Sequence, residues 1–162
     1  LNNGMIPIIS YNYGAQKPDR MKRTMKLGVM VGCSIMVFCL AIMQVFPGQI
    51  LKIFDATDEM LLMGIPAVRI MSTAFIFAGF SVTCSGMFQA VGKGVYSMIV
   101  SMARQLFVIL PVAYFLSKAM NSVNGVWAAF PIAEVFSVII STIFLLRVYK
   151  KIVKPMESVQ RD

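Results

Sequence analysis

The run from Leu27 to Leu51 constrains the fold more than any other feature, because it contains no charged side chain and its strongly polar side chains are limited to Ser34, Gln44 and Gln49. A helix on the surface of a soluble bundle needs a polar stripe at the helical period, and this run has none. About 20 apolar residues in a helix span the hydrocarbon layer of a bilayer, where each backbone amide must bond within its own segment. The run therefore predicts a transmembrane helix.

The whole chain supports an all-α integral membrane protein. Of its 162 residues 58% are apolar and 14% are charged, and the mean hydropathy is +0.76, which does not fit a soluble domain. Four full transmembrane helices are predicted, at 27–51, 66–92, 95–117 and 124–146. Residues 1–14 form an apolar segment that reaches only about 21 Å as a helix, too short to cross. We expect them to be the end of a fifth helix that begins upstream, so that the chain is part of a larger protein.

The distribution of cations predicts the topology. Twelve of the 15 Lys and Arg residues fall on one side of the predicted helices and three on the other, and basic residues near helix ends favour the cytoplasm. The basic loop 15–26 and the basic tail 147–162 are therefore expected to be cytoplasmic in a multi-pass protein of the cell membrane. The opposite side carries the acidic loop with Asp55, Asp58 and Glu59.

The same composition argues against several other classes of protein. The net charge of +8 does not form a basic face with interleaved aromatic residues, so no nucleic acid partner is predicted. The chain has no His, no glycine-rich phosphate loop and no pair of carboxylates within a predicted membrane segment, so we expect neither an enzyme nor a metal site nor a cofactor. The three cysteines have no paired spacing and are expected to be packing residues: Cys33, Cys39 and Cys84.

Glu134 is the strongest candidate for a functional side chain. It lies about ten residues into the last predicted helix, near the bilayer midplane, where carboxylates are costly and usually face a bundle interior or a wet cavity. Pro131 lies one turn earlier and leaves the carbonyl of Trp127 without its usual donor. A kinked helix with a freed carbonyl beside a carboxyl group is a candidate stop for a proton or cation. The alternative is a protonated Glu that bonds a neighbouring helix for structure alone.

Two further polar side chains leave two interpretations each. Arg104, roughly 12 Å along the third predicted helix, could line a cytoplasmic cavity, but its distance from the inner interface favours snorkelling to the headgroups. Gln89 is either part of an interhelical hydrogen bond or a cavity residue. The chain's 14 Met and 12 Phe residues could line an adaptable pocket, although they are also ordinary lipid-facing residues.

Proline and glycine residues mark candidate kinks and contacts. Prolines inside apolar segments, at Pro7, Pro111 and Pro131, favour transport over simple anchoring, because interrupted helices occur where backbone lines a cavity. Gly14 can end the first helix. Gly28 and Gly32 form a GxxxG pair that indicates close helix packing.

Four stretches, in order along the chain, resemble the carboxy-terminal lobe of the multidrug and toxic compound extrusion (MATE) family. They are IPIISYNYGAQKPDRMKR at its start, FQAVGKG at 88–94, SMARQLFVILP at 101–111 and GVWAAFPIAE at 125–134. The resemblance implies the last four helices, and the end of one more, of a twelve-helix antiporter with two lobes.

Such an antiporter would expel cationic or amphipathic small molecules in exchange for protons or sodium. The partner of this part would be the missing amino-terminal lobe. The coupling ion would not be held as a cofactor. The resemblance also gives Tyr11, Asn12 and Tyr13 a cavity-facing or lobe-packing role. The family's coupling carboxylate of the amino-terminal lobe lies outside this sequence. Residues 66–92 lack the acidic residue that some members carry in the matching helix.

Two other functions remain open at this point. A flippase for lipid-linked saccharides shares the two-lobed architecture and would be favoured by cationic cavity residues, for which Arg104 is the candidate. A non-transporting helical membrane anchor or assembly subunit would need only the four apolar helices.

Overall fold

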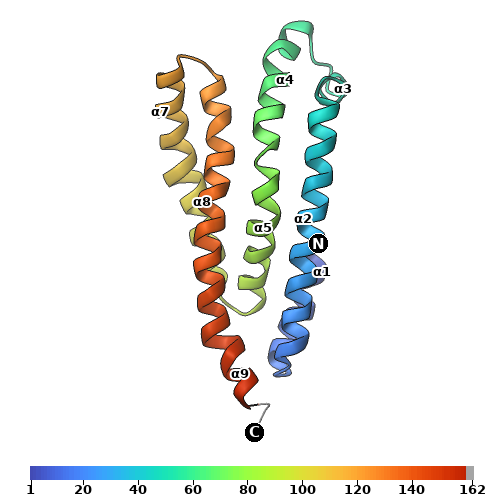
Figure 1. Cartoon of the computed structure of the whole chain (residues 1–162), viewed down its shortest axis with the longest axis vertical. Helices are drawn as coiled ribbons and strands as arrows, with labels where there is room; N and C mark the ends of the chain where they lie inside the picture. Colours follow the sequence, from blue (N-terminus) through green and yellow to red (C-terminus); the bar gives the residue numbers. More distant parts are fainter. Residues whose placement is uncertain (160–162) are drawn as a thin grey trace.

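The computed structural model describes residues 1–159 as a set of helices, with no strand among them (Figure 1). In chain order these are α1 (Asn2–Gly14), α2 (Pro18–Val45), α3 (Pro47–Ile53), α4 (Asp58–Ser72), α5 (Phe75–Ala90), α6 (Gly94–Met102), the π-helix η1 (Ala103–Ile109), α7 (Leu110–Met120), α8 (Asn124–Val148), the π-helix η2 (Tyr149–Val153) and α9 (Lys154–Val159).

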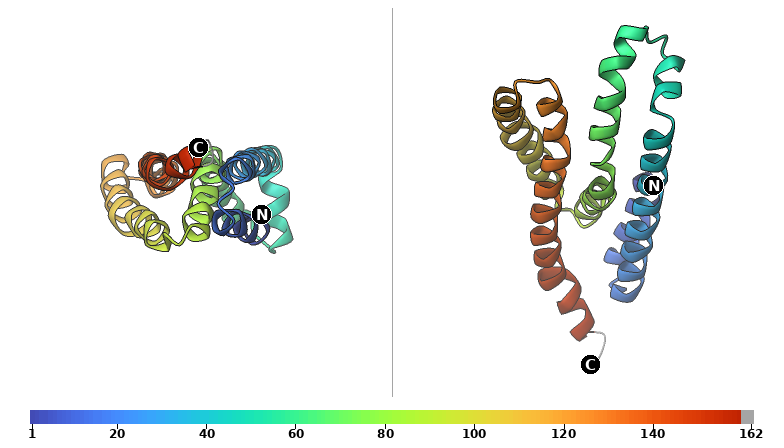
Figure 2. Two further views of the ribbon diagram at one scale, coloured as in Figure 1. Left: turned by 90° about the horizontal axis from the view of Figure 1, so that it is seen from below. Right: turned by 45° about the horizontal axis from the view of Figure 1, so that its top comes forward.

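The helices form an elongated bundle in which α5 is central (Figures 1 and 2). It contacts α1, α2, α6 and α8, while α7 lies beside α8 on the far side from α2. The start of α2 and the short helix α9 lie at one end of the bundle, which we call the basic end because it carries Lys17, Arg20, Lys22, Arg147 and Lys150. The turns between α3 and α4 and between α7 and α8 lie at the opposite end.

The predicted all-α fold with four crossings is confirmed. Within residues 1–159, three continuous helical stretches are long and apolar enough to cross a membrane, at Pro18–Val45, Gly94–Met120 and Asn124–Ser158. The fourth is the pair α4 and α5, which passes the same test as one bent span. Residues 2–14 form α1, which begins about halfway along the bundle and runs to the basic end beside α2 (Figure 1).

The helices extend beyond the predicted crossings into both basic segments. Helix α2 begins at Pro18 rather than near 27, so most of the expected loop 15–26 is helical. It ends at Val45, before Pro47 starts the separate helix α3, because the ring of a proline inside a helix clashes with the preceding turn. The tail after residue 146 continues as helix to Val159, and residues 160–162 lie outside the described residues.

The single helix expected at 66–92 is instead broken between Ser72 and Phe75, where α4 and α5 meet at an angle of 53°. Side chains add hydrogen bonds to the carbonyls at the break. The Thr73 hydroxyl donates to Ile70 O at 2.7 Å, and the Gln44 amide of α2 donates to Arg69 O at 2.8 Å. A broken helix within a membrane is stable only where such hydrogen-bond partners exist. These hydrogen bonds therefore stabilise the break as part of the fold.

Close packing of α2 on α5 depends on glycine. A Cβ added to Gly79 would lie 3.0 Å from Cys33 Cα and 3.1 Å from Gly32 O, which are backbone atoms that cannot move aside. Gly28 and Gly32 of the predicted GxxxG pair face Met5 of α1 and Thr83 of α5. The interpretation of this pair as a packing motif is confirmed, because small residues let helix axes approach closely.

Helix α1 ends at Gly14, as the sequence predicts. Gly14 is the last helical residue, but the left-handed residue is Gln16, with φ 52°. The amides of Gln16 and Lys17 donate to Tyr13 O and Asn12 O at 3.1 and 2.9 Å, which is the Schellman arrangement. At the end of α5, Gly92 (φ 71°) takes the corresponding position.

The largest apolar core lies toward the basic end and joins α1, α2, α5 and α8 to the C-terminal helices. Its fully buried members include Ile9, Met21 and Phe88, and Val153 and Met156 bring η2 and α9 onto it. Lys22 of α2 lies 2.8 Å from Glu157 of α9. The core therefore fixes one end of the bundle and leaves the middle for the cavity described next.

Candidate functional site

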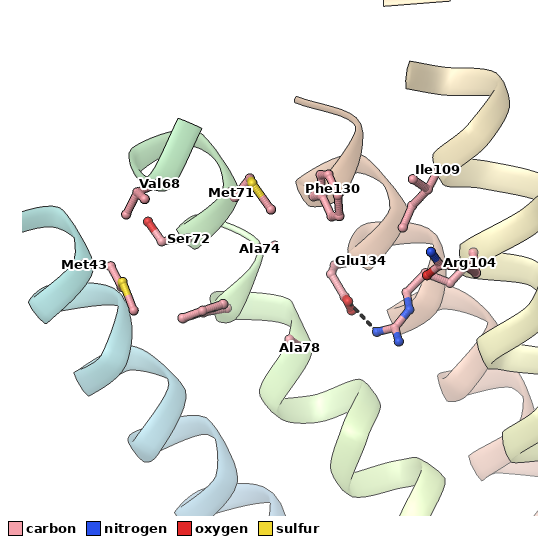
Figure 3. Close-up of a pocket in the computed structure, with 12 residues that line it drawn as sticks. Met43, Val68, Met71, Ser72, Ala74, Ala78, Arg104, Ile109, Phe130 and Glu134 are labelled. Atoms are coloured by element: carbon pink, nitrogen blue, oxygen red, sulfur yellow. Dashed lines mark hydrogen bonds and ion pairs between the residues drawn. The ribbon is translucent and has the colours of Figure 1, made fainter. Parts of the chain in front are cut away.

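A cavity of about 410 Å³ lies midway along the bundle, between α2, α4, α5, η1 and α8 (Figure 3). Most of its wall is apolar: Met43, Val68, Met71, Phe75, Ile109 and Phe130. Pockets of this size with soft methionine and aromatic walls suit drug-sized apolar molecules. The interpretation of Met and Phe as ordinary lipid-facing residues missed this lining, because composition does not reveal which face of a helix points inward.

Arg104 and Glu134 form the charged part of this wall (Figure 3). Arg104 Nη1 donates to Glu134 Oε1 at 2.6 Å, joining η1 to α8 across 30 residues of sequence. The Glu134 side chain is only 9% exposed and that of Arg104 is 30% exposed. In surroundings of low dielectric the attraction is strong, but it must offset the cost of removing both charges from water.

The second carboxylate oxygen, Glu134 Oε2, is buried and has no hydrogen-bond partner among the described residues. A buried acceptor without a donor is costly, since it has lost its hydration. This atom is thus available to a proton, a water molecule or a ligand in the bundle.

Irregular backbone from three directions surrounds the pair. Arg104 lies in the π-helix η1, which precedes Pro111; Pro111 has no N–H for the carbonyl of Phe107, and π-turns commonly accompany such disruptions. Glu134 follows Pro131 by one turn in α8. The break between α4 and α5 contributes Ser72 and Ala74 to the same cavity. The regular helices are therefore interrupted where the charges lie.

The expectation that Arg104 snorkels to the headgroups was wrong, because its guanidinium is held by Glu134 inside the bundle. Assigning Arg104 to the cations of the basic end was wrong for the same reason. Treating the two charges separately missed the pair. The sequence did carry a signal for the pair, because opposite charges lie in two apolar helices that are joined by a short turn. Each charge is costly in the membrane without a partner, and the other is the nearest partner available.

The other predicted site residues lie away from this cavity. The Gln89 amide donates to the Ser97 hydroxyl at 3.1 Å, which settles its two interpretations in favour of an interhelical hydrogen bond between α5 and α6. Tyr11 is 71% exposed and Tyr13 packs against the core of the basic end. Asn12 is buried, and its amide donates to Ile8 O at 2.8 Å. Pro7 lies inside α1, and its role as a hinge stays a prediction.

The bent and interrupted helices around a central cavity define this chain as part of a multi-pass membrane protein. The MatE family model matches residues 1–115. The chain therefore belongs to the MatE family, which is a family of membrane transporters.

Two relatives in Staphylococcus carry the name multidrug export protein MepA. The protein of S. haemolyticus (strain JCSC1435) is 27% identical over 128 residues, which cover 79% of this chain and 28% of that protein. The protein of S. aureus (strain bovine RF122 / ET3-1) is 28% identical over 134 residues, or 83% of this chain and 29% of that protein. The chain thus spans less than a third of the length of the relatives that it matches.

Solved structures agree with this assignment. The MATE multidrug transporter DinF-BH, solved in complex with a ligand, is 32% identical and superposes with a TM-score of 0.82, covering 94% of this chain and 33% of that one. An inward-facing MATE family transporter of the MOP superfamily gives a TM-score of 0.85 at 18% identity, covering 97% of this chain and 36% of that one, which shows the shared fold.

Proposed function

We propose that this chain is part of a transporter that exports amphipathic or cationic small molecules across the cell membrane in exchange for protons or sodium. The observation that carries the proposal is the apolar cavity whose wall contains the buried Arg104–Glu134 pair. The names of the relatives, which describe multidrug export and multidrug transport, support the substrate class.

The chain would form most of one lobe in a twelve-helix, two-lobed protein that alternates between inward- and outward-facing states. Its fold resembles both an inward-facing and an outward-facing MATE family transporter, with TM-scores of 0.85 and 0.84 at 18% identity, as is expected for a lobe that moves as one body. The basic end would be cytoplasmic, because its cations follow the positive-inside rule.

Glu134 would take part in coupling. Protonation of this carboxyl group would remove the negative partner of Arg104 and leave a cation in the cavity wall, which is costly in low dielectric. A cationic substrate would then be repelled from the wall, whereas it would be tolerated beside the neutral pair. The same pairing speaks against a lipid-linked saccharide flippase, because Arg104 is already engaged by Glu134 and is not a free cation for a pyrophosphate.

Efflux measurements test this function. Cells that express the full-length protein are expected to accumulate less of a fluorescent cationic dye than control cells, and the difference should vanish when an ionophore collapses the ion gradient. Dye accumulation is measured by fluorescence, with proton and sodium ionophores applied separately. Dye levels that do not respond to the protein or to either gradient would contradict the proposal and favour a non-transporting anchor.

Cysteine labelling tests the topology. With the native cysteines replaced, Asp19→Cys at the basic end and Ala56→Cys at the opposite end should react with a membrane-impermeant maleimide from opposite sides of the membrane. We expect the cysteine at position 19 to react only after the cells are opened. Reaction of both cysteines from the same side would overturn the orientation.

A further inference from the structure

The face of α8 below Glu134 carries buried hydroxyl groups that the cavity does not use. Ser137 and Ser141 follow Glu134 by three and seven residues, on the same face of the helix. They are 1% and 0% exposed, against 7% for Glu134. Glu134 Oε2, Ser137 Oγ and Ser141 Oγ all lack a hydrogen-bond partner among the described residues. Three unpartnered oxygens thus follow one another over about 10 Å of helix.

These two hydroxyls differ from several others on the membrane helices. A buried Ser or Thr in an apolar helix usually donates to the carbonyl one turn earlier, and Thr83 does so to Gly79 O and Thr142 to Val138 O, both at 2.7 Å. The exposed Ser34 makes the same bond to Met30 O at 2.8 Å. Ser137 and Ser141 make none, so their donors and acceptors are both available to a partner outside their own helix.

Small side chains of α5 lie at the levels of the two hydroxyls of α8. The two helices run in the same direction (Figure 1), and they meet at two levels. Ala78 and Glu134 line the cavity together, and ten residues further along each helix the rings of Phe88 and Phe144 lie 6.2 Å apart. The equal spacing places Ser81, which is 2% exposed, at the level of Ser137, and Ser85 at the level of Ser141.

An aromatic cluster closes this interface toward the basic end. Phe144 stacks on Tyr96 with ring centroids 4.5 Å apart, and Phe88 meets both rings edge-on. We call the strip between Glu134 and these rings, formed by Ser81, Ser85, Ser137 and Ser141, the hydroxyl seam. It is joined to the cavity at Glu134 and meets these rings at its other end, and within it the Ser81 hydroxyl already donates to Phe77 O at 3.3 Å.

We propose that the hydroxyl seam holds a file of buried water molecules that connects Glu134 Oε2 with the hydroxyls of Ser137 and Ser141 and carries protons between this carboxylate and the basic end. Buried polar groups that lack protein partners are usually satisfied by such water molecules. The transfer is balanced because each water or hydroxyl accepts one proton and donates another, with no net change in the seam. The inference rests on the proposed coupling role of Glu134.

The seam gives Glu134 a route for protons that is separate from the substrate cavity. A carboxyl group that exchanges protons only through the cavity would be blocked whenever a substrate fills it. A second route along α8 would let protonation proceed with substrate bound, and the ring cluster of Phe88, Tyr96 and Phe144 would narrow the route at its basic end and so exclude larger ions.

Hydration of the seam is tested with silver ions on the full-length protein in proteoliposomes, with Cys33, Cys39 and Cys84 replaced by Ala. In the variants Ser137→Cys and Ser141→Cys, the introduced thiol is expected to bind Ag⁺ in the folded protein. The bound Ag⁺ then prevents the thiol from reacting with maleimide when the protein is unfolded. The matched control is Ile139→Cys on the same helix, which is 51% exposed and should stay unprotected. Equal protection at all three positions, or none at 137 and 141, would overturn the proposal.

The proton route is tested with the double variant Ser137→Ala/Ser141→Ala. Removing buried, unpartnered hydroxyls should leave the fold intact, but proton uptake coupled to transport is expected to slow by about fivefold or more, as for the loss of a hydrogen-bonded relay. Dye affinity should not change. Ser137→Thr, which keeps the hydroxyl, should restore the rate, and Ser34→Ala should have no effect. Unchanged proton uptake in the double variant would contradict the route, whereas absence of gradient-driven transport in the unmodified protein would contradict the proposed function instead.

Discussion

Removing one member of the Arg104–Glu134 pair is expected to lower the free energy of unfolding by about 3 kcal/mol, because the remaining charge is left buried without a partner. Arg104→Met leaves the carboxylate, and Glu134→Gln leaves the guanidinium beside a neutral amide. The Arg104 side chain is 30% exposed to the cavity, so the loss is expected near the lower end of the range for buried pairs. Thermal unfolding of the purified full-length protein in detergent measures it.

The double variant Arg104→Met/Glu134→Gln separates stability from function. With both charges gone, much of the lost stability should return, because replacing a buried ion pair by neutral groups is often nearly neutral. Gradient-coupled dye transport should remain lost in Glu134→Gln and in the double variant. Normal coupled transport by Glu134→Gln would reduce this carboxylate to a structural residue, and additive stability losses would show that the two side chains do not interact.

Filling the glycine contact between α2 and α5 is expected to have the second large effect. Gly79→Ala places a methyl group 3.0 Å from Cys33 Cα and 3.1 Å from Gly32 O, which is tighter than nine in ten contacts of real Cβ atoms. Because the contact is with backbone, the two helices must move apart, at a cost of about 1–3 kcal/mol. Gly79→Leu should cost more and reduce the amount of folded protein in the membrane. Fluorescence-detected size-exclusion chromatography of membrane extracts measures both.

Gly4→Ala is the matched control for this prediction. It also lies in an apolar helix, but nothing lies within 4 Å of the added Cβ, so the change should be neutral or stabilise the helix by up to about 1 kcal/mol. If Gly79→Ala behaves like Gly4→Ala, the close approach of α2 and α5 is not a requirement of the fold.

Several sequence predictions failed for a common physical reason. The break between α4 and α5 has no proline at its centre; it is stabilised by Thr73 and by Gln44 of another helix, and a partner 25 residues away leaves no local signal. The start of α2 at Pro18 was not predicted, because hydropathy measures which residues enter lipid. A helix can continue beyond the apolar residues into water.

The candidate site was predictable in part. Glu134 was recognisable because a carboxylate in an apolar helix is costly wherever that helix lies. Its partner was misassigned, since Arg104 at the same depth can snorkel or pair, and the choice depends on which face of its helix meets α8. The unpartnered hydroxyls of Ser137 and Ser141 were not recognised at all, because a serine in an apolar helix normally satisfies itself.

The sequence by itself determined the membrane class, the four apolar crossings and the separation of positive charge to one end, because these follow from the free energy of transferring each segment between water and lipid. The tertiary structure decided which polar groups meet, as Arg104 does with Glu134 and Gln44 with the α4–α5 break, and which hydroxyls of α8 lack a partner among the described residues. In lipid a polar group is satisfied only by neighbours in space, and those neighbours come from helices that are distant in the chain.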